Sequence, residues 1–100
     1  MSLFLVERYL PGISESMLHG AERRLARRLT GQATTSRVRL IGSVLIRGED
    51  TVLSLFEADD PAAVRRVNEA ADFALDRITE VIDVAATPVT SPDLSGFGAG

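Results

Sequence analysis

The chain has 100 residues, of which 45% are hydrophobic and 25% charged. This length is sufficient for one domain with one hydrophobic core and excludes a second core. Its net charge of -3 gives no general attraction to phosphate backbones, and we expect no nucleic-acid partner. The absence of cysteine excludes disulfides, thiolate metal sites and cysteine nucleophiles, and with no signal-like or membrane-length apolar segment we expect a cytoplasmic protein without a membrane partner.

The first predicted element is a strand from Leu3 to Leu10, which ends at Pro11-Gly12. Successive side chains of a strand point to opposite faces, so Glu7 and Arg8 fall on different faces, each among hydrophobic residues. Both faces of the sheet therefore need a cover. The sequence does not say which of them the helices cover, because both sets of side chains are largely apolar.

An amphipathic helix follows, with Ser14 or Ser16 as its N-cap and Gly31 just past its end. Its apolar stripe is formed by Leu18, Ala21, Leu25 and Leu29. The segment from Arg37 to Arg47 then alternates throughout and predicts a long strand. The short connection Gly48-Glu49-Asp50 predicts a hairpin between this strand and the next one, Thr51 to Ala58.

A second helix is expected from Asp60-Pro61, an N-cap followed by a proline at the first helical position, to about Ala71. The alternation of β-branched residues from Arg77 to Val84 predicts the last strand. Proline, serine, threonine and glycine dominate afterwards. We therefore expect a folded domain over residues 1–85 and a flexible C-terminal tail over residues 86–100.

The element order, strand, helix, strand, strand, helix, strand, predicts an α+β fold of the ferredoxin-like βαββαβ type. Right-handed crossovers place both helices on one face of a four-stranded antiparallel sheet with strand order 4-1-3-2. The other face stays bare and carries more apolar surface than a monomer usually exposes. We expect a second copy to cover it, giving a homodimeric α/β barrel.

Several short segments carry a resemblance to known proteins: residues 4–12, 38–40, 42–44, 55–58 and 76–78, with Val64, Asn68, Ala70 and Ala71. Together they resemble a family of small bacterial domains of unknown function that is common in actinobacteria and has some members described as nickel-binding. The resemblance spans about residues 3 to 85 and implies a ferredoxin-like fold, a homodimer and nickel as a possible cofactor, but no reaction. Members often have a cysteine where this chain has Ser54, and a serine hydroxyl is a weaker metal ligand than a thiolate.

His19 is the only histidine and the candidate metal ligand. On a helix it is flanked by Glu15 one turn before and Glu22 one turn after, and these three residues would hold a divalent ion weakly if they converge. The simpler interpretation is a solvated helix surface. The run Arg23-Arg24 with Arg27-Arg28 likewise has two interpretations, an anion patch or a solvated helix face.

Five residues of the strands are the candidate ligand-binding set: Glu7, Tyr9, Arg39, Glu57 and Arg77. The expected strand order brings Glu7 or Arg8 near Arg77 and Glu57 near Arg39. These charges either satisfy one another inside a dimer interface or line a small polar cavity, where arginines favour an anionic ligand. Asn68 on the second helix is expected to make a local hydrogen bond.

The leading hypothesis is a homodimeric binding module of unknown activity that binds a small anionic molecule or, weakly, a divalent metal. The alternative is a dimeric α/β-barrel enzyme that performs proton transfer or isomerisation with Glu7 or Glu57 as general base. A third hypothesis, nickel sequestration, follows from the resemblance alone.

Overall fold

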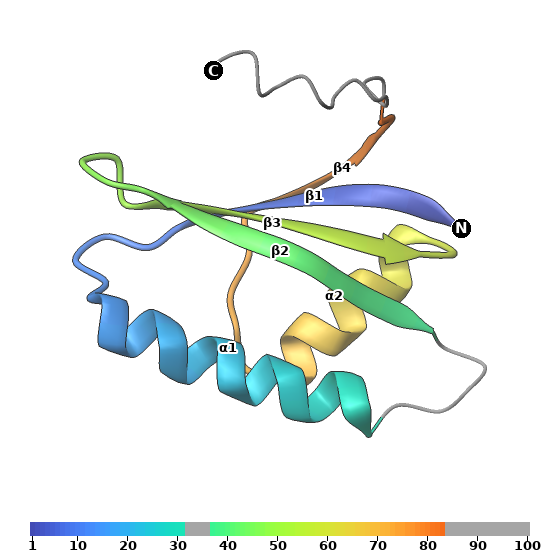
Figure 1. Cartoon of the computed structure of the whole chain (residues 1–100), viewed down its shortest axis with the longest axis horizontal. Coiled ribbons are helices and arrows are strands. Elements are labelled where there is room, and N and C mark those ends of the chain that lie inside the picture. The colour runs from blue at the N-terminus through green and yellow to red at the C-terminus, as the bar shows by residue number, and fades with distance from the viewer. Residues whose placement is uncertain (32–36, 84–100) are drawn as a thin grey trace, which may run out of the picture.

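The computed structural model describes residues 1–31 and 37–83. Its elements are β1 (Ser2–Tyr9), α1 (Glu15–Thr30), β2 (Val38–Ile46), β3 (Thr51–Ala58), α2 (Pro61–Ala70) and β4 (Arg77–Val81). The strands form one antiparallel sheet in the order β2-β3-β1-β4, and both helices lie on the same side of it (Figure 1). The predicted ferredoxin-like fold and the predicted strand order are confirmed.

Both helices begin where their capping residues predict. The Ser14 hydroxyl accepts a hydrogen bond from the backbone N–H of Met17 at 3.1 Å, and the Asp60 carboxylate accepts one from Ala63 at 2.8 Å. Each contact satisfies an N–H group that has no partner within the helix. Pro61 follows Asp60 at the start of α2, where its missing N–H costs nothing.

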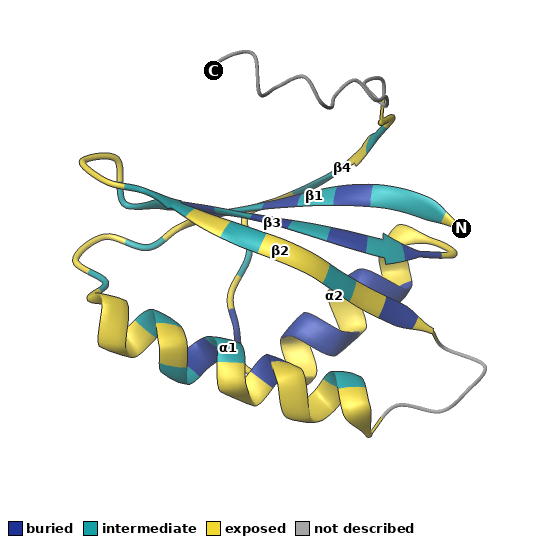
Figure 2. Cartoon of the chain, viewed as in Figure 1, coloured by how far each residue is buried: buried dark blue, intermediate teal, exposed yellow. Residues whose placement is uncertain are grey.

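The core lies between the sheet and the two helices. Buried residues alternate along β1 and β3 and recur on α1 and α2 (Figure 2). The alternation on β1 puts Phe4, Val6 and Arg8 on the side of the helices and leaves Leu3, Leu5, Glu7 and Tyr9 on the other side. The structure thus shows which face of the sheet the helices cover, which the sequence left open. Of the adjacent charged residues Glu7 and Arg8, it is Arg8 that lies on the helix side.

Strand β2 does not alternate throughout, so this part of the sequence prediction is wrong. The register against β3 shifts between Leu40 and Gly42, which leaves Ile41 as an extra residue in a β-bulge. A bulge exchanges the faces of the residues beyond it, so that Ser43 pairs with the buried Ser54 while Val44 stands exposed on the opposite side. The bulge therefore adds apolar surface to the face without helices.

The last strand is shorter than predicted and ends at Val81. Ile82, expected to continue it, lies beyond the strand with 83% of its surface exposed. Val84, the domain boundary at residue 85 and the tail from residue 86 lie outside the described residues. In the described part of the chain, neither helix combines the length and the apolar character needed to cross a membrane.

Candidate ligand site on the open sheet face

The open face of the sheet, defined as the side without helices, carries a mixture of aliphatic and charged side chains. Leu3 and Leu5 of β1 and Leu53 and Leu55 of β3 are only partly covered. No element among residues 1–31 and 37–83 packs over them (Figure 1). The five predicted ligand-binding residues lie on this face, because each pairs in register with one of its members.

Two ion pairs join neighbouring strands on the open face. Arg39 Nε donates to Glu57 Oε1 at 3.0 Å and Arg39 Nη2 lies 2.9 Å from the same oxygen, while Arg77 Nε lies 3.3 Å from Glu7 Oε2. These are the predicted partners. The two carboxylate side chains are 31% and 35% exposed and the two arginines 66% and 68%, so in a single copy each pair adds little stability.

The two pairs occupy different ends of the open face. Glu57 stands opposite Leu3, whereas Glu7 lies four residues further along β1, which is about 13 Å at the usual rise per strand residue. Leu5 and Leu55 lie between them, and Tyr9 extends beyond Glu7 opposite Thr51. Within one copy the five predicted residues therefore form two separate groups on one surface.

Two hollows of the open face lie next to the Arg39–Glu57 pair. The larger one, of about 630 Å³, is lined by Leu3, Ile41, Leu55 and Glu57 with Met1, Val81, Ile82 and Asp83. A second one of about 270 Å³ has Arg37, Val38 and Met1 beside the pair itself. Glu57 lines both hollows. This end of the face, with apolar walls and a few polar groups, has the character of a small-molecule site.

The residues around His19 that were predicted to bind a metal ion do not converge in the described part of one copy. His19 is exposed on α1, Glu15 makes an ion pair with Arg47, and the carboxylate of Glu22 lies on the inner side near Arg8. Among residues 1–31 and 37–83, no three histidine or carboxylate side chains come close enough together to hold a metal ion. His19 is thus a single potential ligand, and the described residues of one copy do not fit a nickel ion.

Arg8 has a role that the sequence did not predict. It is fully buried and donates from Nη2 to Asn68 Oδ1 at 2.7 Å, and from Nη1 to the carbonyls of Phe73 and Ala74 at 3.3 and 3.2 Å. Its guanidinium lies 3.5 Å above the centre of the Phe73 ring. Asn68 in turn donates to the Val64 carbonyl at 2.8 Å, which confirms its local hydrogen bond.

Arg8 is charged at neutral pH despite its burial. Loss of hydration lowers the pKa of Arg8 to about 10, while the negative charge of Glu22 acts in the opposite direction. Among the residues that the structure describes, neither the buried oxygen Oε2 of Glu22 nor Arg8 Nε has a hydrogen-bond partner. The signal for this role was the arginine within an apolar strand, but the acceptors of its hydrogen bonds lie 60 to 66 residues away in the chain.

Comparison with known proteins gives a family and a similar structure. Residues 4–81 match the family model described as "Nickel responsive protein SCO4226-like". The crystal structure of SCO4226 from Streptomyces coelicolor A3(2) is similar, with 25% sequence identity and a TM-score of 0.73 over 84% of this chain and 100% of that chain. No curated protein matches the chain. The resemblance inferred from the sequence is confirmed, and the chain belongs to the SCO4226-like family of nickel responsive proteins.

Proposed function

We propose that the protein is a small homodimeric binding module that holds a small anionic ligand between the open faces of two copies. The observation that carries this proposal is the open face itself: a band of leucines with an arginine–carboxylate pair at either end. Partly exposed leucines on a flat sheet favour burial against another surface. A second copy brings a surface with the same apolar centre.

The size of the open face supports a second copy as its cover. Four strands spaced by about 4.8 Å, with a mean length near 25 Å, present about 500 Å² in projection. Two copies together bury about 1,000 Å², the lower limit of a specific interface, before the relief of the side chains is counted. Each of the two ion pairs on this face contains one arginine and one carboxylate, so the pairs carry no net charge. Two copies that meet through this face therefore do not repel each other through a net charge of these pairs.

The assembly has a direct test in the mass of the protein in solution. Light scattering is expected to give twice the subunit mass of 10.8 kDa. A mass of one subunit at the concentrations used for binding would contradict the proposal.

The anionic ligand is proposed to bind at the Arg39 end of the face. Arg39 is mostly exposed and has N–H groups that do not bind Glu57. Arg37 and Arg39 both line the hollow of about 270 Å³. Guanidinium groups bind carboxylates through two parallel hydrogen bonds. An apolar wall beside them suits the carbon chain of a small organic acid.

Succinate is a suitable probe of this end of the face. It is expected to shift the amide NMR resonances around Arg39 and Glu57, and Arg39→Ala is expected to weaken its binding about tenfold through loss of the charged donor. The matched control is Arg47→Ala, which removes an exposed arginine that pairs with Glu15 away from the hollow. Equal weakening by both variants would contradict a site at Arg39.

Nickel binding is a second candidate, favoured by the description of the family model. Because one copy offers His19 without converging partners, a nickel site needs further ligands from a second copy. The proton-transfer alternative has less support, since each candidate base, Glu7 and Glu57, already lies against an arginine.

Calorimetry with Ni²⁺ distinguishes these cases. Because the described residues of one copy bring no three metal-ligating side chains together, we expect no saturable binding at micromolar Ni²⁺. The wild type and His19→Ala are then expected to behave alike. Saturable binding by the wild type that His19→Ala abolishes would favour the nickel candidate instead. Glu49→Ala, which removes an exposed acidic residue of the β2–β3 hairpin, is the control for a general effect of surface charge.

A further inference from the structure

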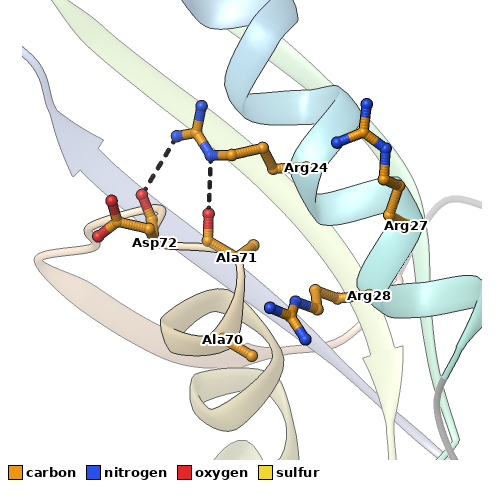
Figure 3. A pocket seen from close by; sticks show the side chains of 6 residues that line it. All are labelled: Arg24, Arg27, Arg28, Ala70, Ala71 and Asp72. Carbon is orange, nitrogen blue, oxygen red and sulfur yellow. Dashed lines mark hydrogen bonds between the residues drawn. The ribbon is translucent and has the colours of Figure 1, made fainter.

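The helical side of the protein carries a second concave surface, formed where the C-terminal half of α1 meets the end of α2. The hollow has a volume of about 490 Å³ and is lined by Arg24, Arg27, Arg28 and Asp72, with Ala70 and Ala71 (Figure 3). Three cations less one carboxylate leave a local charge of +2 in a chain whose net charge is -3. Three of the four arginines of this run thus line one hollow.

Arg24 is held in place by the end of α2. Its Nε donates to the Ala71 carbonyl at 2.9 Å and its Nη2 to the Asp72 carbonyl at 3.2 Å (Figure 3). These carbonyls follow the last turn of the helix, where cations are favoured. Arg24 thus donates to two carbonyls at the end of α2 and still has N–H groups on the other edge of its guanidinium that can bind a ligand.

Arg27 and Arg28 have no such task. Both are exposed, and no described residue accepts a hydrogen bond from either side chain or pairs with its charge. The guanidinium of Arg28 extends toward the end of α2 near Ala70, on the other side of the hollow from Arg24 (Figure 3). The Arg27 carbonyl near the end of α1 accepts hydrogen bonds from Gly31 N–H and the Thr30 hydroxyl and from neither of the two guanidinium groups.

We propose that this hollow binds a phosphate group, with Arg24 and Arg28 as its direct donors and Arg27 adding positive charge. A guanidinium presents N–H groups in the spacing of two phosphate oxygens, and a fixed arginine loses less entropy on binding than a free one. The hollow is on the opposite side of the sheet from the open face. Its occupation is therefore independent of the dimer and of the ligand at Arg39.

Titration with inorganic phosphate at low ionic strength, followed by calorimetry and by the arginine Nε–H resonances, tests this site. Arg28→Gln is expected to weaken phosphate binding at least about tenfold, as expected for the loss of a charged bidentate donor. Arg23→Gln is the matched control, because it removes the same charge from an exposed position of α1 outside the hollow. Arg23→Gln is expected to leave phosphate binding unchanged.

Equal weakening by Arg23→Gln and Arg28→Gln would overturn the proposal, because it would show attraction by net charge alone. Absence of saturable binding by the wild type would overturn it as well. Phenyl phosphate distinguishes the source of the group: binding at least as tight as that of inorganic phosphate supports a phosphate ester as ligand, and binding of inorganic phosphate only supports the free ion. Circular dichroism of both variants confirms that the helices remain folded.

Discussion

Replacement of Arg8 by methionine is expected to lower the free energy of unfolding by about 3 to 5 kcal/mol, the usual cost of removing one partner from a buried charged network. Methionine fills similar space but leaves three acceptors, Asn68 Oδ1 and the carbonyls of Phe73 and Ala74, without their donor. It also leaves the inner carboxylate of Glu22 without the cation that faces it. Urea denaturation followed by circular dichroism measures the loss.

Two further variants separate the causes of this loss. Arg8→Lys keeps the charge but cannot stack on Phe73 and donate along both edges, so an intermediate loss is expected. Arg24→Met removes two hydrogen bonds to carbonyls from a more exposed position, and we expect a loss of about 1 kcal/mol. An Arg8→Met protein as stable as the wild type would show that Arg8 does not hold the segment between α2 and β4.

The pH dependence of the Arg8 effect follows from the direction of its pKa shift. The folded pKa of Arg8, about 10, lies below the pKa of the same group in the unfolded chain. The unfolded chain therefore binds more protons only between these two pKa values, and the stability contributed by Arg8 rises with pH in that range. At lower pH both states are charged. The difference between wild type and Arg8→Met is therefore expected to stay constant from about pH 6 to pH 9.

The contacts of Arg8 also explain the placement of β4. The segment between α2 and β4 is tied to the end of β1 twice more, since Asp76 N–H donates to the Glu7 carbonyl at 2.8 Å and the Asp76 carboxylate accepts from Tyr9 N–H at 2.6 Å. These bonds fix where β4 starts and hence bring Arg77 opposite Glu7. The buried charge on the helix side thus supports the ion pair on the open face.

The fold was predictable because each element carries its own periodicity and its own ends. Ser14, Asp60 and Pro61 mark helix starts through local contacts, and the apolar stripes distinguish helices from strands. The facing of β1 was not predictable, since Phe4 and Leu5 serve equally well as core residues by hydrophobicity. In the observed facing Arg8 reaches acceptors that belong to residues distant in the chain, which no local pattern reveals.

The candidate site was predictable in its pairs and less so in its layout. The strand order alone places Arg39 beside Glu57 and Arg77 beside Glu7, as observed. The bulge at Ile41 was missed because both alternating sets of residues in this strand contain apolar side chains, so one additional residue leaves no clear mark in the hydrophobic pattern. The hollow beside Arg24 depends on the approach of α2 to α1, which no local pattern specifies.

Leu5→Glu is expected to dissociate the proposed dimer while leaving each subunit folded. Leu5 lies at the centre of the open face, paired in register with Leu55 on one side and Thr79 on the other. In a two-fold symmetric interface the substitution buries two carboxylates without partners, which weakens association at least about 100-fold. Light scattering over a range of concentrations measures the change in mass.

Met17→Glu is the matched control, because it adds the same carboxylate to a side chain of α1 that is already 62% exposed on the helical side of the sheet. This variant is expected to keep the mass of the wild type. Phe4→Glu, one residue from Leu5 but inside the core, is expected to unfold the subunit instead of separating the dimer. If Leu5→Glu keeps the mass of two subunits, the leucines of the open face do not form the dimer interface. The ligand proposed at Arg39 would then bind to a surface that no second copy covers.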